Sequence, residues 1–282
     1  MVCSVTCFAK CDTMTTEKQK AFTLLELLIV ISVIALLMAI LMPALGAARL
    51  QAFSIVCRSN LSQLVLANIG YATENDGYLV PAASDFLDNA GHYRWHGYRD
   101  NLGEPFDPLR GPLVRYLGDG KVKECPGPVE FVKAHKWEIS FEQGCGGYGY
   151  NMLYLGSRLW QKGFGSGDPK SYSMTTPLAE VAKPSATLMF ADAAFYQFYE
   201  DNKYLIEYSF IEPRYRVRNG TVKTNSFPVP SIHFRHKQCA NVGWADRHVS
   251  PKRIADYDFY TDLAKMNLGW FEPIDNSLFD LK

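Results

Sequence analysis

A group of imidazole and carboxylate side chains lies near the C-terminal end of the 282-residue sequence. Its members are His233, His236, Asp246 and His248. Imidazole nitrogens and carboxylate oxygens are ligands that zinc and other borderline metals accept, so one interpretation is a metal site. The alternative is that His236 and Asp246 hydrogen-bond across the base of a hairpin and hold the fold. We favour this structural alternative, and expect no cofactor unless a metal ion binds here.

Cysteine is the second residue type whose spacing suggests chemistry. Three of the seven cysteines, Cys3, Cys7 and Cys11, form a C-x3-C-x3-C pattern, which differs from the C-x2-C pairs of common zinc sites. We therefore interpret residues 1–13, which precede the second candidate start Met14, as a gene-start artefact or an inert leader rather than a metal site. The other four cysteines are disulfide candidates, for which three pairings exist. They are Cys57, Cys125, Cys145 and Cys239.

Motifs of common catalytic sites are missing from the sequence. It contains no G-x-S-x-G, no H-E-x-x-H and no cysteine–histidine pair in a known frame. The Gly-rich segment 163–167, GFGSG, lacks the Lys-Ser/Thr that completes a phosphate-binding P-loop. We therefore do not expect an enzyme.

An apolar segment over residues 22–42 is the most prominent feature of the chain. About 20 apolar residues suffice to span a bilayer as a helix, whereas the apolar part of a signal peptide has roughly 7–15. The segment therefore predicts a retained single membrane span. Lys18 and Lys20 precede it and favour a cytoplasmic N-terminus, although Arg49 and Arg58 on the far side weaken that signal.

Two residues in this region are unusual for a membrane helix. Glu26 places a carboxylate near the start of the span, so it either reaches water at the interface or pairs with a cation. Pro43 removes a backbone donor and therefore stops or kinks a helix. Because a helical pattern continues beyond Pro43, the sequence favours a kink.

The segment AFTLLE, residues 21–26, resembles the cleavage site of type IV prepilins. The resemblance implies that a prepilin peptidase cuts between Ala21 and Phe22 and that the new amino group of Phe22 is methylated. Ala21 stands where the family usually has Gly. Counted from Phe22, Glu26 is the fifth residue and Pro43 the twenty-second, as in the family.

Cleavage would give Glu26 a partner. The amine left on Phe22 is cationic near neutral pH, and Glu26 lies four residues further along the same helix face. The carboxylate can neutralise this amine in its own chain or in a neighbour's, and a neutralised pair is tolerated among packed helices. The expected partners are therefore prepilin peptidase, the membrane and other pilin-like subunits.

A second resemblance covers the region after the span. His236, nine further residues and Asp246-Arg247 resemble the H-x9-DG segment of a pseudopilin-like family (DUF1559), with Arg247 in place of the usual Gly. A two-residue turn of the Asp-Gly type needs positive φ at both positions, so Arg247 makes that turn costlier. Four further segments agree with the family: 57–64, 116–126, 147–151 and 186–193. The resemblance implies a Cys57–Cys125 disulfide, which leaves Cys145 to pair with Cys239. The alternative is that some of the four remain free thiols, buried as small hydrophobic side chains.

The fold class implied is α+β and pilin-like, with a long N-terminal helix packed on an antiparallel sheet. Apolar residues spaced by three and four continue the helix to Glu74, and Asn75-Asp76-Gly77 ends it. We expect these domains: 1–21, a cytoplasmic leader; 22–42, a transmembrane assembly helix; 43–76, its extension; and 77–282, an extracytoplasmic β-rich domain. Predicted strands lie near residues 113–117, 187–191, 206–211, 215–217, 231–234 and 241–245.

Overall charge and aromatic content bound the function. Lys and Arg together number 29, as do Asp and Glu together, which argues against a nucleic-acid partner bound by bulk positive charge.

We expect an inner-membrane structural subunit of a type IV pilus or type II secretion pseudopilus. The alternative is a membrane-tethered binding module, in which tryptophans form a sugar-stacking platform instead of packing in the core. The five tryptophans are Trp95, Trp137, Trp160, Trp244 and Trp270.

Overall fold

The computed structural model describes most of the chain after the expected leader. The described residues are 22–86, 91–129, 131, 142–162, 168, 170–199, 202–255 and 261–282. Ala21, the three leader cysteines, Trp137 and the GFGSG segment lie outside them. The chain divides into two compact units, residues 1–47 and 48–282, and each is described by itself.

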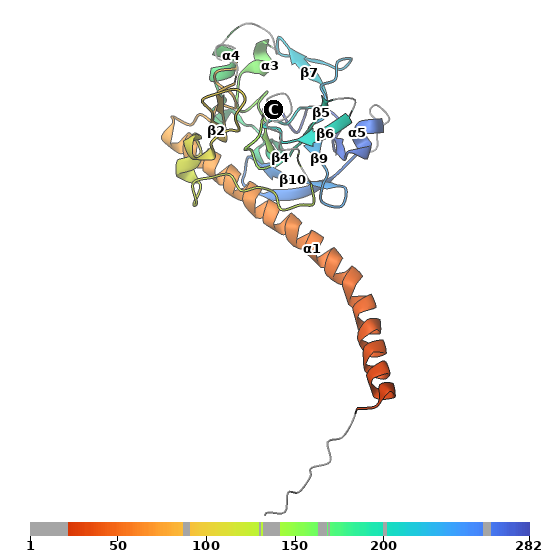
Figure 1. Ribbon diagram of the computed structural model, residues 1–282. Coiled ribbons are helices and arrows are strands. Elements are labelled where there is room, and N and C mark those ends of the chain that lie inside the picture. Colours follow the sequence, from red (N-terminus) through yellow and green to blue (C-terminus); the bar gives the residue numbers. More distant parts are fainter. Residues whose placement is uncertain are drawn as a thin grey trace, which may run out of the picture. The chain divides into compact units, whose positions relative to one another are not determined.

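The helix α1, Leu24–Glu74, is 51 residues long and begins in the first unit (Figure 1). Among the described residues it is the one helix long and apolar enough to cross a membrane. All its side chains in the first unit are exposed. Pro43 lies inside the helix, which continues past it, so Pro43 does not stop the helix.

The end of α1 follows the sequence prediction. Asp76 and Gly77 adopt left-handed φ values of 51° and 83°. The Gly77 N–H donates to the carbonyl of Ala72 at 2.8 Å, which satisfies one of the carbonyls left open at a helix end. The chain then turns into the globular part of the second unit.

The strands of the second unit are short. In chain order they are β1 Tyr93–Arg94, β2 Gly97–Tyr98, β3 Tyr148–Tyr150, β4 Leu188–Asp192, β5 Phe195–Tyr199, β6 Asn202–Ile206, β7 Arg216–Arg218, β8 Thr221–Lys223, β9 Ile232–His233, β10 Cys239–Trp244, β11 Val249–Arg253 and β12 Leu268–Gly269. The central sheet has the order β11-β10-β4-β3, and every neighbouring pair in it is antiparallel. The pairs β1-β2, β5-β6, β7-β8 and β9-β12 form two-stranded sheets.

Short helical turns connect these strands. They are η1 Pro108–Arg110, η2 Val114–Tyr116, α3 Leu159–Lys162, α4 Lys170–Ser173, η3 Leu178–Glu180, η4 Pro184–Ala186 and α5 Thr261–Lys265. The long helix and antiparallel sheets confirm the predicted α+β, pilin-like class.

The part of α1 in the second unit packs directly on the central sheet. Its buried side chains include Leu61, Leu64 and Val65. A Cβ atom on Gly243 of β10 would lie 2.8 Å from Val65 Cγ2, so only glycine allows the helix and this strand to approach so closely. The core therefore lies between α1 and the sheet.

Two predicted strands differ from the structure. Residues 113–117 contain the 3₁₀ turn η2 instead, in which the backbone N–H groups of Tyr116 and Leu117 donate to the carbonyls of Leu113 and Val114, three residues earlier, and not to a neighbouring strand. Residues 206–211 contribute only Ile206 to a strand. The remainder meets β3 through a parallel bridge between Phe210 and Tyr150.

Candidate functional site

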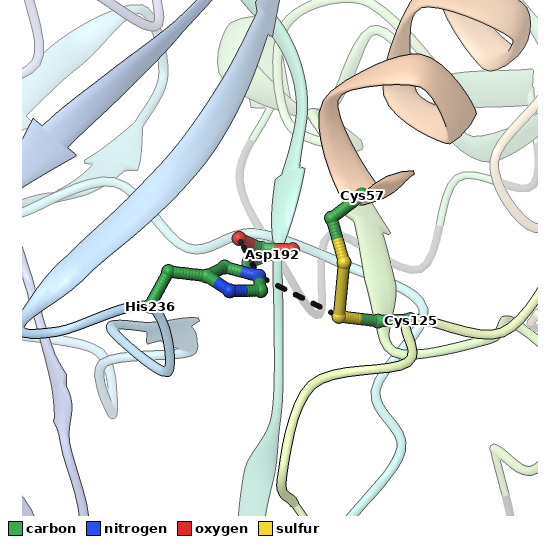
Figure 2. Close-up of side chains that lie close together, drawn as sticks. All are labelled: Cys57, Cys125, Asp192 and His236. Atoms are coloured by element: carbon green, nitrogen blue, oxygen red, sulfur yellow. Dashed lines mark hydrogen bonds and ion pairs between the residues drawn. A yellow bond between two sulfur atoms is a disulfide. The ribbon is translucent and has the colours of Figure 1, made fainter. Parts of the chain in front are cut away.

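A disulfide links α1 to the loop that follows η2. The Cα atoms of Cys57 and Cys125 lie 5.4 Å apart, which confirms the pairing implied by the family resemblance (Figure 2). Cys57 is fully buried and Cys125 partly buried. The Cys125 N–H donates to the carbonyl of Gly146 at 3.0 Å, which attaches the loop to the segment before β3.

His236 and Asp192 lie next to this disulfide. The Nε2 atom of His236 is 3.6 Å from Cys125 Sγ and 3.4 Å from Asp192 Oδ2 (Figure 2). Asp192 is the last residue of β4 and is completely buried. Its Oδ2 also accepts a hydrogen bond of 2.7 Å from the backbone N–H of Asn241.

Burial determines the charge state of this pair. It lowers the pKa of His236 to about 4, and the cations Arg235 and Arg58 add to the lowering. It raises the pKa of Asp192 to about 6, against the opposing effect of Arg235. At neutral pH the imidazole is therefore neutral, with a lone pair available on an unprotonated nitrogen, and the carboxyl is mostly ionised.

The four residues predicted as a metal site do not converge. His233 lies in β9 with its Nε2 3.1 Å from the carbonyl of Met266. Asp246 and His248 pair with each other in the exposed turn between β10 and β11. His236 contacts Asp192 rather than Asp246, so the predicted hydrogen bond across the hairpin base is also wrong.

The turn itself explains part of this difference. The Arg247 N–H donates to the carbonyl of Trp244 at 3.0 Å, and of Asp246 and Arg247 only Arg247 has a positive φ, 82°, so these two residues do not form a two-residue turn of the Asp-Gly type. His236 starts a separate tight turn to Cys239, closed by backbone hydrogen bonds of 3.0 and 3.1 Å in both directions. Lys237 and Gln238 have left-handed φ values there and aim the histidine towards the disulfide.

The second predicted disulfide is wrong, because Cys145 and Cys239 are free thiols. Cys145 lies shortly before β3 and Cys239 begins β10, and β4 runs between these two strands. Strands two positions apart in a sheet are separated by about 9–10 Å. A disulfide needs Cα atoms within about 7 Å.

The tryptophans do not form an exposed platform within the described residues. Trp95, Trp244 and Trp270 are buried, and Trp160 is partly buried with its ring stacked on that of Tyr154. These rings contribute apolar area to the core. The sugar-binding alternative therefore has no support from these four residues.

At the other end of the described chain, Thr23 and Glu26 form a reciprocal cap on α1. The backbone N–H and the hydroxyl of Thr23 each donate to Glu26 Oε2 at 2.9 Å. The Glu26 N–H donates to Thr23 Oγ1 at 3.2 Å. This is the capping box expected of Thr-x-x-Glu at a helix start, and sequence reasoning missed it although the spacing is visible in AFTLLE.

Residues 17–42 match the prokaryotic N-terminal methylation motif. This match supports the prepilin-type nature of the N-terminal segment. No curated protein and no solved structure gives a match to the chain.

The methylation motif covers the expected cut and the first unit's helix together. It contains Ala21, Phe22 and Glu26 and ends at Met42, immediately before Pro43. The helix starts two residues after the expected new N-terminus, at Leu24. A prepilin-type motif followed by an apolar helix is typical of structural subunits of the pilin and pseudopilin type.

Proposed function

We propose that the chain is a structural subunit of a type IV pilin-like or type II secretion pseudopilin-like assembly. The observation that carries the proposal is the coincidence of the methylation motif at 17–42 with the apolar start of α1. The leader is removed before Phe22, which is then methylated, and α1 packs with the same helix of other subunits. The H-x9-DG resemblance from His236 to Asp246 supports membership of the DUF1559 pseudopilin-like proteins.

The disulfide supports the proposed topology. Disulfides form and persist outside the cytoplasm, so the Cys57–Cys125 bond fits an extracytoplasmic second unit. The lysines before the apolar segment favour a cytoplasmic N-terminus, against the weaker opposing signal of Arg49 and Arg58. The protein thus crosses the inner membrane once before assembly.

The mature N-terminus tests the proposal. Intact mass and N-terminal sequencing of membrane-extracted protein should give a chain that begins with N-methylated Phe22. A matched variant, Ala21→Gly, restores the residue usual in prepilins and should be processed at least as completely as the natural sequence. A chain that keeps Met1 or Met14, or that begins near residue 45 as after signal-peptidase cleavage, would contradict the proposal.

A further inference from the structure

Four metal-binding side chains meet at the disulfide. One ligand atom each from Cys57, Cys125, Asp192 and His236 lies within 4.8 Å of the others (Figure 2). Two sulfurs, one imidazole nitrogen and one carboxylate oxygen are a donor set that suits a tetrahedral zinc site. Of the predicted metal ligands, only His236 belongs to this set.

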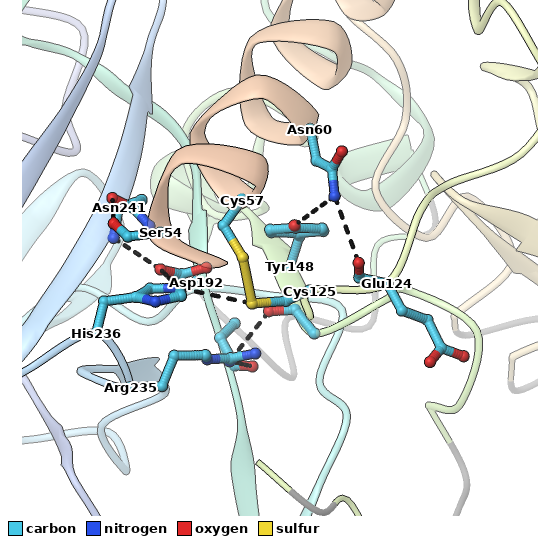
Figure 3. Close-up of a disulfide and its surroundings, with 12 residues drawn as sticks. Ser54, Cys57, Asn60, Glu124, Cys125, Tyr148, Asp192, Arg235, His236 and Asn241 are labelled. Atoms are coloured by element: carbon cyan, nitrogen blue, oxygen red, sulfur yellow. Dashed lines mark hydrogen bonds and ion pairs between the residues drawn. A yellow bond between two sulfur atoms is a disulfide. The ribbon is translucent and has the colours of Figure 1, made fainter. Parts of the chain in front are cut away.

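The four side chains come from separate parts of the second unit and are held firmly. Cys57 lies on α1, Cys125 in a loop, Asp192 at the end of β4, and His236 in the turn before β10 (Figure 3). Gly127 leaves room for them, because a Cβ atom there would lie 3.3 Å from both Cys125 Sγ and His236 Cε1. The fold, and not a flexible surface, therefore brings the ligands together.

The carboxylate has bonding capacity that the disulfide form does not use. Asp192 Oδ1 is buried and accepts no hydrogen bond from the described residues. A buried carboxylate oxygen without a hydrogen bond is costly, and the side-chain amide of Asn241, which lowers the pKa of Asp192, is the one other polar group of β10 that acts on it, so the carboxylate keeps capacity for a ligand. Asn241 holds the other oxygen, Oδ2, from the backbone of the neighbouring strand.

A positive charge next to the four ligands suits a zinc complex whose net charge is negative. Zn²⁺ with two thiolates and one carboxylate carries a net charge of −1. The buried guanidinium of Arg235 is next to the group and donates to the carbonyl oxygens of Gly147 and Ala193 (Figure 3). Its positive charge balances the site.

We propose that the chain binds one zinc ion through Cys57, Cys125, Asp192 and His236 Nε2 when the two cysteines are reduced. This dithiol form is the one in which the chain is synthesised, and metal binding releases the two thiol protons. The disulfide and the zinc site exclude each other. To pass from zinc to disulfide, the two thiolates form the S–S bond and lose two electrons to an external disulfide, which takes up two protons and becomes two thiols, and the ion is released.

Metal titration of the reduced protein tests this inference. The full chain in detergent, with Cys3, Cys7 and Cys11 replaced by Ser to remove the leader thiols, is reduced with a phosphine and titrated with Co²⁺. One equivalent should produce the visible bands of tetrahedral cobalt and a thiolate-to-cobalt charge-transfer band. Zn²⁺ should displace both signals, and the oxidised protein should show neither.

Substitutions assign the ligands. Asp192→Asn and His236→Gln should each weaken metal affinity by at least about tenfold, the lower end of what loss of even an outer-shell partner costs. The matched controls Cys145→Ser, Cys239→Ser and His233→Gln should leave the titration unchanged. Peptide mapping of each oxidised variant, which should still contain the Cys57–Cys125 bond, checks that it folds.

Two results would overturn the inference. One is a reduced protein without the thiolate band, or with a band that Cys239→Ser abolishes. The other comes from zinc-edge X-ray absorption of the zinc-loaded protein with all its ligands intact, and does not depend on how any ligand variant folds. Two sulfur and two nitrogen or oxygen neighbours are expected, and any other ligand count would refute the assignment.

Discussion

The Cys57–Cys125 disulfide ties α1 to the loop after η2, across a sequence separation of 68 residues. The bond closes much of the first half of the second unit into one covalent loop. In the chain-entropy model a loop of this size restricts the unfolded chain enough to stabilise the folded state by about 4 kcal/mol.

Removal of the disulfide should therefore destabilise the second unit strongly. The double variant Cys57→Ser, Cys125→Ser should lower the free energy of unfolding by up to about 4 kcal/mol. Urea unfolding of the full chain in detergent measures this. The control is Cys239→Ser, because Cys239 is a partly exposed free thiol, and its free energy of unfolding should equal that of the natural sequence. Equal midpoints for the double variant and the natural sequence would contradict a stabilising disulfide.

Glu26 caps α1 through Thr23, and the proposed assembly gives it a second, separable role as a negative charge for the Phe22 amine. Glu26→Gln keeps a side chain that can close the capping box but removes the charge. Glu26→Val removes both. If the charge is what subunits need, both variants should be processed normally and both should assemble poorly, measured as crosslinked multimers per processed subunit.

The assembly yields of Glu26→Gln and Glu26→Val separate the effect of the cap from the effect of the charge. Assembly that survives in Glu26→Gln and fails in Glu26→Val would show that the cap matters and the charge does not. Unchanged assembly in both would mean that Glu26 only reaches the water interface. Thr23→Ala, which weakens the cap and keeps the charge, is the matched control and should cost about 0.5–2 kcal/mol of helix stability.

Asn151 connects three segments of the core. Its side-chain amide donates to the carbonyl oxygens of Leu188 at 2.9 Å and Phe279 at 2.8 Å, and the residue is fully buried. Asn151→Ala leaves both carbonyls without this partner, and each unsatisfied buried group costs about 1–3 kcal/mol. We expect a loss of about 3 kcal/mol in urea unfolding. The exposed Asn101→Ala should change stability by less than about 0.5 kcal/mol.

Glu212 should make stability depend on pH. Burial raises the pKa of its carboxyl to about 7, while a hydrogen bond from the Tyr208 hydroxyl opposes the rise. Between about pH 4.5 and pH 7, the Glu212 carboxyl is therefore protonated in the folded state and ionised in the unfolded state. The stability contributed by this group is full below about pH 4.5 and is lost as pH rises towards 7.

Glu212→Gln isolates this effect because it stays neutral at every pH. Between pH 5 and pH 7.5 the natural sequence should lose about 1 kcal/mol relative to the variant. The loss stays this small because Glu212 borders a surface cavity of about 470 Å³, where solvent screens its charge. If the free energy of unfolding changes equally with pH in the two proteins across this range, the pKa of the Glu212 carboxyl is not raised in the folded state.

Several features were predictable because their causes are local in the sequence. The apolar run and the spacing of Phe22, Glu26 and Pro43 identify the N-terminal helix, and Gly77 marks the end of α1. Strand β4 was expected from its own apolar residues. The Thr23–Glu26 cap is local in the same way and was visible in the sequence.

The arrangement around the disulfide was decided by tertiary structure. The sequence grouped His236 with Asp246, but the sheet order places Asp192 of β4 beside β10 and so beside His236. The same order puts β4 between Cys145 and Cys239 and prevents their pairing. Strand order and register depend on how α1 and all four strands of the sheet share one core, and spacing along the chain does not encode which distant side chains that packing brings within bonding distance.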